Sequence, residues 1–317
     1  MVEQAGRTAY HGKNNDQAEE EILLMPFSYL TQKGFDSKNA SARMWRSFNH
    51  WLNVPKDKLS LVTSILERLY SAVLLLDDVE DDSELRRGIP TAHLILGTAR
   101  TLNAANYVTL IEIMKLVDLK EPKVIDYVIE MGLGVSKSQG LGIYYRNNFI
   151  CPTEDEYIEF ASGQFNSMFT FVVRLLQLFS DNKTTDFTVL IQKLSLFCQI
   201  YNDYLSLHSK KYATLKTFCD DVTEGKFSFP IIHAIHSQPN DDKILNILKQ
   251  KTKDIETKKY FVRLLEKFGS FEYTIKVLEK LRDEAVEEMN KIGGNSHLEE
   301  IFELILNNID SEVYFDC

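Results

Sequence analysis

A cluster of acids followed by two arginines is the first feature of the sequence that could do chemistry. Asp77, Asp78 and Asp81 directly follow an apolar stretch, and Arg86 and Arg87 come next. On a helix, Asp77 and Asp81 would share a face, with Asp78 about 100° further round. Carboxylates at this spacing suit Mg²⁺, which usually binds through one or two carboxylates plus phosphate oxygens. Because arginine suits phosphate, these residue types together indicate a diphosphate site.

An acidic run of this kind is more often a solvated helix end, and two observations favour the functional interpretation. The acids directly follow residues 72–76, Ala-Val-Leu-Leu-Leu, which predict that the helix carrying them is buried. A second polar motif also occurs downstream. We therefore expect the two motifs to belong to one site.

The second polar motif follows another apolar run, residues 194–201. Asn202, Ser206 and Lys210 are spaced by four, so a continuous helix would place all three on one face. The ordinary alternative is a helix end at which Asn and Ser bond the local backbone. Lys216 and Lys226 follow and could reach a phosphate, although a lysine taken alone is more often a surface residue.

The composition restricts the class of function. The chain has 317 residues, of which 44% are hydrophobic and 26% charged, which is compatible with one large all-helical domain. The net charge of −10 argues against nucleic acid as a partner, whereas metal ions can screen an anion site. The four cysteines form neither a zinc pattern nor a disulfide framework, which predicts a reducing compartment.

The N-terminus and the hydropathy lead to further expectations. Residues 1–20 are polar and lack the apolar core of a secretory signal, so we expect a disordered tail followed by one domain over 21–317. No uninterrupted apolar run reaches about 18 residues, so we expect no membrane span and a cytoplasmic protein.

Apolar residues at three- and four-residue spacing predict helices along most of the chain, and no convincing alternating strand pattern occurs. Proline and glycine fall mostly between the periodic segments. We therefore predict a single all-α domain of roughly ten helices. The periodic segments cover 52–76, 104–117, 124–135, 157–179, 187–207, 244–248, 260–268, 274–289 and 298–309.

With these motifs the chain resembles the trans-isoprenyl diphosphate synthases, and within them the animal geranylgeranyl diphosphate synthases. The resemblance extends from about Leu23 to Ile309. Besides Asp-Asp-x-x-Asp and Arg-Arg-Gly within 75–93, the segments that carry it are 48–52, 151–154, 177–180, 223–230 and 269–274. It implies an isoprenoid synthase helical bundle around a deep apolar cavity, usually a homodimer. Up to three Mg²⁺ ions, which Mn²⁺ could replace, would hold an allylic prenyl diphosphate.

The resemblance also implies roles for individual residues. Asp77, Asp78 and Asp81 would be metal ligands, while Arg86 and Lys226 would bind the allylic diphosphate. Lys216, Lys210 and Arg87 are further candidates for the same anion.

The sequence departs from the family where a chain-elongating synthase binds isopentenyl diphosphate. The family uses a Gly-Lys-x-x-Arg motif, a histidine before the first acidic motif and the second arginine of Arg-Arg-Gly. Here the arginine position is Ser41 and the histidine position is Tyr70, so only Lys38 and Arg87 remain. Losing one charge-assisted partner of a buried anion costs roughly 1.5–3 kcal/mol, so we expect a poor second site.

The allylic side has changed as well. A family Lys-Thr pair is Gln164-Phe165 here, and the second acidic motif begins Asn202-Asp203 and continues to Ser206. Asn and Ser four residues apart resemble the second metal motif of class I terpene synthases, in which a Glu at i+8 completes the set. Because Lys210 stands at i+8, the shell could be completed by Asp203 or by a phosphate oxygen, or Lys210 could replace one cation.

These changes resemble insect-type terpene synthases derived from geranylgeranyl diphosphate synthases. The predicted activity is Mg²⁺-dependent ionisation of an allylic diphosphate, followed by cyclisation or deprotonation of the cation in a dry cavity. Small Ala72 favours geranylgeranyl diphosphate over farnesyl diphosphate as substrate. An elongating geranylgeranyl diphosphate synthase and a non-catalytic partner subunit remain alternatives. The expected catalytic set is Asp77, Asp78, Asp81, Arg86, Asn202 and Ser206, and the expected cavity residues are Ala72, Val73, Phe165, Phe169 and Tyr201.

Overall fold

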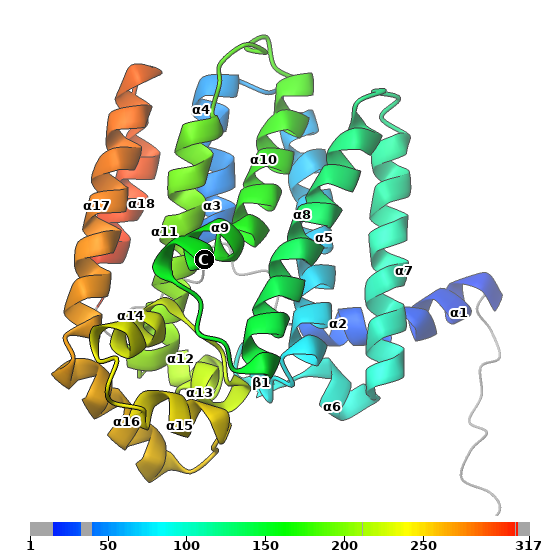
Figure 1. Ribbon diagram of the computed structural model, residues 1–317. Helices are drawn as coiled ribbons and strands as arrows, with labels where there is room; N and C mark the ends of the chain where they lie inside the picture. The colour runs from blue at the N-terminus through cyan, green and yellow to red at the C-terminus, as the bar shows by residue number, and fades with distance from the viewer. Residues whose placement is uncertain (1–14, 33–39, 211, 308, 310–317) are drawn as a thin grey trace, which may run out of the picture.

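The computed structural model describes residues 15–32, 40–210, 212–307 and 309. These residues form helices almost throughout, and the one hairpin among them has strands of two residues each. The predicted all-α fold class is therefore confirmed (Figure 1). Long helices run side by side through the centre of the molecule, and neighbours in this bundle pack against one another. They are α5 (Lys56–Glu80), α7 (Thr98–Val117), α8 (Val124–Asn148), α10 (Gly163–Leu178), α11 (Thr188–His208) and α17 (Ser270–Lys291).

Shorter helices cover the bundle. Helices α3 (Ala40–Ser47) and α4 (Asn49–Leu52) lie against α10, and α18 (Ser296–Asn307) lies against α17 and α3. Helices α1 (Asn15–Leu23), α2 (Met25–Thr31) and α6 (Ala92–Leu96) lie beside α7. The lower end of the bundle in Figure 1 is built from α12 (Tyr212–Leu215), α13 (Asp220–Glu224), α14 (Phe229–Ser237), α15 (Lys243–Lys249) and α16 (Ile255–Lys267). Helix α9 (Glu154–Ala161) lies at mid-height and contacts α8, α10, α11 and α14.

Some element boundaries differ from those predicted. Helix α5 begins at Lys56 because Pro55 is its N-cap, and the segment predicted as one helix over 157–179 divides into α9 and α10. Helix α8 continues well beyond Val135 despite its glycines. One of these glycines, Gly134, lets α10 approach closely. A Cβ at Gly134 would lie 1.9 Å from Ser167 Oγ.

The N-terminal part differs from its prediction, and one helix bears on the expectation of no membrane span. Helix α1 begins at Asn15, so residues 15–20 are helical rather than disordered, and residues 1–14 lie outside the described part. Among the described residues, α5 is long and apolar enough to cross a membrane by length and composition alone. Half of its most apolar stretch is buried inside the bundle, which is typical of a core helix.

The apolar core has two parts on opposite sides of α5. The larger part fills the bundle between α5, α10, α11 and α17. The smaller one joins α5 to α2, α6 and α7, and includes Phe27, Leu30, Ala72 and Val108. Because α5 is enclosed on both sides, the position of its acidic end is fixed by the bundle.

Candidate active site

The first acidic motif occupies the end of α5. The helix stops at Glu80, Asp81 is its C-cap, and Asp82 turns into the left-handed region with φ of 54°. The backbone N–H of Asp81 donates to the carbonyl of Asp77 over 2.9 Å, so the two aspartates lie one turn apart, as predicted.

A tight hairpin brings the first arginine back to these acids. Strands β1 (Leu85–Arg86) and β2 (Ile89–Pro90) pair antiparallel, and Arg87 and Gly88 both have positive φ, which is the geometry of a type I′ turn. Gly88 donates its N–H to Leu215 O over 2.9 Å, and a Cβ there would lie 3.2 Å from Thr214 O. The Arg-Arg-Gly motif therefore positions Arg86 and joins the hairpin to the segment before Lys216.

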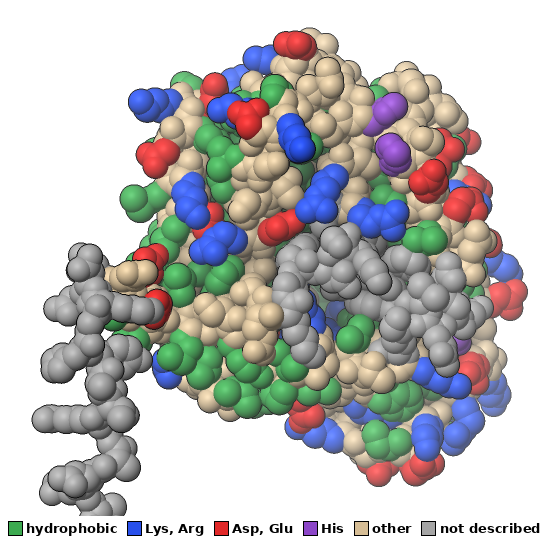
Figure 2. Space-filling view, turned by 180° about the vertical axis from the view of Figure 1, so that it is seen from behind, with side chains coloured by type: hydrophobic (Ala, Val, Ile, Leu, Met, Phe, Trp, Pro, Cys, Tyr) green, Lys and Arg blue, Asp and Glu red, His purple; other side chains and the backbone are tan. Residues whose placement is uncertain are grey.

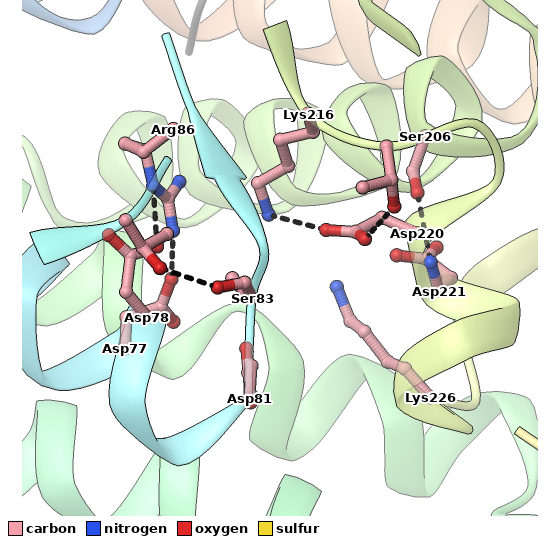
Figure 3. Close-up of polar contacts among 12 residues, drawn as sticks. Asp77, Asp78, Asp81, Ser83, Arg86, Ser206, Lys216, Asp220, Asp221 and Lys226 are labelled. Atoms are coloured by element: carbon pink, nitrogen blue, oxygen red, sulfur yellow. Dashed lines mark hydrogen bonds and ion pairs between the residues drawn. The ribbon is translucent and has the colours of Figure 1, made fainter. Parts of the chain in front are cut away.

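Arginines hold all three aspartates of the motif. Arg86 Nη2 lies 2.7 Å from Asp77 Oδ2, and Arg86 Nε donates to Asp78 Oδ1 over 2.8 Å. Arg146, at the end of α8, donates from Nη1 to Asp81 Oδ1 over 2.6 Å. Figure 3 shows Arg86 above Asp77 and Asp78, with Asp81 closer to the opposite wall. Burial raises the pKa of Asp78 and of Asp81, against the lowering effect of their arginines.

The opposite wall comes from α11, α13 and the segment between them. Ser206 lies on the last turns of α11, and its Oγ accepts the backbone N–H of Asp221 over 3.3 Å. Asp221 and Glu224 are buried on the short helix α13. Burial raises the pKa of Asp221 to about 6, and burial together with the negative charge of Asp81 raises the pKa of Glu224. Acids from α5 and α13 thus face the same space.

Asp203 has a different environment from the other candidate metal ligands. It is fully buried, and both of its carboxylate oxygens accept hydrogen bonds from within the protein. Gln199 Nε2 and Lys226 Nζ donate to Oδ1 over 3.0 and 2.9 Å, while Tyr157 OH and the Phe229 N–H donate to Oδ2 over 2.5 and 2.9 Å. In this structure its carboxylate is committed to holding α9, α11 and α14 together.

The prediction that Lys210 shares a helix face with Asn202 and Ser206 is wrong. Helix α11 ends at His208, and its C-cap Ser209 is extended, with ψ of 120°. Lys210 therefore lies beyond the helix, where it is exposed to solvent.

Two adjoining cavities lie between these walls. The main cavity holds about 830 Å³ of space, part of it open to solvent, and the side cavity about 640 Å³. They share polar residues that lie between them, namely Asp77, Asp81, Gln164, Gln199 and Lys226. The other charged or polar residues of the main cavity are Arg86, Asn202, Ser206, Lys216, Asp221 and Glu224, and apolar ones include Val73, Leu74, Phe165 and Met168.

Some predicted cavity residues lie elsewhere. Val73 and Phe165 line the main cavity, as expected, but Ala72 packs in the smaller core cluster on the far side of α5. Phe169 packs against Trp45 and Phe48, and Tyr201 stacks on Phe197. None of Ala72, Phe169 and Tyr201 lines either cavity, so the argument on substrate length from Ala72 has no support here.

The predicted remnants of an isopentenyl diphosphate site are described in part. Tyr70, at the family's histidine position, lines the main cavity and packs edge-on against Trp45, with 5.7 Å between ring centroids. Arg87 occupies the turn of the hairpin. Lys38 and the side chain of Ser41 lie outside the described part of the chain.

The acids around the main cavity fit a divalent cation. Among the described residues, no three or more His, Cys, Asp or Glu side chains are placed close enough to hold a metal ion by themselves. However, Asp221 Oδ2 and Glu224 Oε1, in the wall of the main cavity, are buried without a hydrogen-bond partner. The same holds for Oδ2 of Asp78, a residue that lines neither cavity. Buried carboxylate oxygens of this kind are costly unless a charge offsets them, and oxygen ligands are those that Mg²⁺ prefers.

Comparison with known proteins identifies the family of the chain. Residues 20–265 match the model of the polyprenyl synthetase family. A terpene synthase from Matsumurasca onukii is 46% identical over 93% of this chain and 96% of the relative. Geranylgeranyl pyrophosphate synthases from Mucor circinelloides f. lusitanicus and Hypoxylon pulicicidum are 39% and 43% identical, over 93% and 86% of this chain and 96% and 70% of the relatives.

The fold and the family match define an enzyme of isoprenoid biosynthesis. The chain belongs to the polyprenyl synthetase family, and the resemblance to trans-isoprenyl diphosphate synthases is confirmed. Enzymes of this family generally use Mg²⁺ and prenyl diphosphates.

Sequence reasoning missed three residues of the site. Arg146 reaches Asp81 across 65 positions of sequence, and no local pattern indicated this contact. Asp221 and Glu224 carried a readable signal, because acids three residues apart share a helix face and Gly225 ends the helix that carries them.

Proposed function

We propose that this enzyme is a class I terpene synthase. It ionises an allylic prenyl diphosphate with Mg²⁺ and releases diphosphate, and the carbocation, cyclised or still linear, loses a proton to give a terpene hydrocarbon. We expect geranylgeranyl diphosphate as substrate on the family resemblance, with farnesyl diphosphate as the next candidate. The observation that carries the proposal is Tyr70, an aromatic ring packed on Trp45 in the cavity wall where the family has a histidine for the second substrate. The 46% identical relative named terpene synthase supports it.

Residues on both walls would hold the metal ions. Asp77, Asp78 and Asp81 serve on the first wall, and Asn202 and Ser206 on the second. Asp203 was a candidate, but four donors already occupy its carboxylate, so we assign its place to Asp221 and Glu224. When bound, Mg²⁺ neutralises the charge that develops on the departing diphosphate.

The chain's own cations bind the same group. Arg86 and Lys216 line the main cavity and Lys226 lies between the two cavities, so all three can face the diphosphate. Burial by itself lowers the pKa of Lys226, but the carboxylates of Asp203, Asp221 and Glu224 outweigh this effect and raise it. The lysine therefore keeps its positive charge at neutral pH.

The apolar part of the main cavity receives the hydrocarbon chain. Val73, Leu74, Phe165 and Met168 exclude water, which would otherwise capture the cation. The ring of Phe165 can stabilise a passing positive charge by roughly 0.5–2 kcal/mol.

A chain-elongating geranylgeranyl diphosphate synthase is the second candidate. The retained Arg87 favours it, and so do the relatives that carry this name. The loss of cationic side chains at Tyr70 and Ser41 favours the first candidate.

A homodimer is the proposed assembly, in a cytoplasmic setting. Several large apolar side chains on α7 and α8 are more than half exposed, among them Leu110 at 61%, Met114 at 67%, Ile129 at 54% and Leu133 at 68%. Leu94 and Ile95 on α6 are exposed too, and hydrophobic side chains gather at the lower left of Figure 2, on the side of α6. Exposed apolar area on this scale is typical of a subunit interface.

Product analysis tests the activity. The purified protein receives Mg²⁺ and one prenyl diphosphate of 10, 15 or 20 carbons, without isopentenyl diphosphate, and the organic extract is analysed. We expect a hydrocarbon from one chain length. Longer diphosphates that form only after isopentenyl diphosphate is added would establish the elongating synthase instead, and silence under both conditions would indicate a non-catalytic partner subunit.

A further inference from the structure

Arg146 lies at the last turn of α8 and contacts the end of α5 in two ways. Its Nη1 donates to Asp81 Oδ1 over 2.6 Å, and its Nη2 donates to the carbonyl of Glu80 over 2.8 Å. The arginine is 7% exposed and lines the side cavity. One guanidinium thus binds both the carboxylate and a terminal carbonyl of the helix that carries the acidic motif. A cation at this end also suits the helix dipole.

The arrangement matches the one around Asp77. Arg86 holds Asp77 by Oδ2, and Arg146 holds Asp81 by Oδ1. Gln139, also on α8, donates to the same oxygen of Asp81 over 3.3 Å. Within the described part of the chain, Asp77 Oδ1 and Asp81 Oδ2 accept no hydrogen bond, and both aspartates line both cavities. Each aspartate therefore has one oxygen held by protein and one left for a ligand.

We propose that Arg146 is the positioning residue for Asp81: it holds one carboxylate oxygen so that the other is presented to a metal ion. The inference rests on the proposed function, because it assumes that Asp81 is a metal ligand. The planar guanidinium makes two hydrogen bonds in a fixed geometry, which removes the rotational freedom that an unsupported aspartate would have. Partners that orient metal ligands are typically worth about 10- to 100-fold in metal affinity.

The test measures metal binding without turnover. Inorganic pyrophosphate is added, Mg²⁺ is titrated, and the rise in Tm gives the Mg²⁺ concentration at half effect, since a ligand of the folded state raises Tm. We expect Arg146→Gln to raise this concentration about 10- to 100-fold. Arg146→Lys, which keeps the charge but not the fork, should recover part of the loss. Gln139→Leu should raise it between about two- and tenfold.

The matched control is Arg174→Gln. Arg174, on α10, pairs with an acid of a neighbouring helix as Arg146 does, namely Glu130 of α8, but this pair is exposed and lines neither the main cavity nor the side cavity. The Arg174→Gln substitution should leave the Mg²⁺ concentration at half effect, here called the midpoint, unchanged within about twofold, the scatter of such a titration. A purely structural role for Arg146 would lower the Tm of the metal-free protein and leave the midpoint where it is.

Several outcomes would overturn the inference. A folded Arg146→Gln variant with an unchanged midpoint would do so, and a lower midpoint would show that Arg146 competes with the metal. If Arg146→Gln does not fold, unchanged midpoints in both Arg146→Lys and Gln139→Leu overturn it. If Mg²⁺ and pyrophosphate do not raise the Tm of the unsubstituted protein, the proposed function itself fails. A failure of the Arg146 inference alone would leave that rise in Tm intact.

Discussion

Helices α5 and α11 both end in a polar motif at the main cavity, but their aspartates have opposite surroundings. Asp77 and Asp81 keep 17% and 14% of their side-chain surface exposed, and an arginine holds each by one oxygen. Asp203 is fully buried, and four donors take up both of its oxygens. Under the proposed function, the same residue type therefore binds metal on one helix, whereas on the other it holds helices together. The partners of the carboxylate, and not the motif alone, decide which.

Helix α13 supplies what α11 does not. Asp221 and Glu224 carry buried oxygens without hydrogen-bond partners. The pKa of each carboxyl is raised, and burial is the largest cause of the rise. A wall with unneutralised acid is costly without a ligand, which is the physical basis for assigning a cation to it. The comparison between α5 and α11 then predicts different consequences for superficially similar substitutions.

The largest effect is expected for Asp77→Asn. The substitution removes a charged oxygen that faces the cavity and leaves Arg86 with a weaker partner, so kcat/KM should fall at least about a hundredfold. The measurement is steady-state turnover of the preferred prenyl diphosphate at saturating Mg²⁺. Asp57→Asn, in the exposed first turn of the same helix, is the control and should keep its activity. If both variants behave alike, the acidic end of α5 is not the reaction centre.

Asp203→Asn should act on stability instead. An amide offers one acceptor oxygen, and its NH₂ group would face two of the four donors that Asp203 now satisfies. Breaking a buried charge pair by removing one partner costs about 3–5 kcal/mol. Urea unfolding without Mg²⁺ should show this loss, whereas Asp77→Asn should show little. A variant as stable as the unsubstituted protein, with weakened Mg²⁺ binding, would return Asp203 to the metal site.

The pH dependence of stability should show the raised pKa of Asp221. Its pKa is raised from 3.8 to about 6 in the folded protein, so the folded state holds its proton more tightly than the unfolded chain does. Its contribution to stability is therefore fully present below about pH 3.8 and is lost as the pH rises through about 6. At about 1.4 kcal/mol per pKa unit, the loss is about 3 kcal/mol.

The measurement compares unfolding free energies at pH 4 and pH 7 without Mg²⁺, in the unsubstituted protein and in Asp221→Asn. Relative to this variant, the protein should lose stability between the two pH values. Parallel pH curves would mean that the pKa of Asp221 is not raised in the folded protein. The contrast between the unneutralised acids of α13 and the arginine-held acids of α5 would then weaken. Asp57→Asn, whose side chain is exposed, provides curves that should run parallel.

The parts of the site that are local in sequence could be predicted, and the others could not. The spacing of Asp77 and Asp81 on one helix turn depends on five consecutive residues, and the hairpin that returns Arg86 is local too, although we did not predict it from the sequence. Arg146 could not be placed, because its contact with Asp81 depends on how α8 packs against α5. Ala72 was misplaced for a related reason. Successive helical residues point about 100° apart, and only the tertiary packing decides which of them faces a cavity.

Lys210→Ala should have the smallest effect, and it tests the end of α11. The i+8 spacing assumed that the helix continues, but Ser209 is extended and Lys210 is exposed beyond it. Truncating an exposed side chain here should change stability by less than about 0.5 kcal/mol and leave kcat/KM within about twofold. Lys226→Ala is the matched contrast, because Lys226 donates to Asp203 and lines both cavities, and it should lose at least about tenfold. A comparable loss in Lys210→Ala would mean that the segment after His208 folds over the diphosphate during the reaction, so that the second wall is completed by a lysine after all.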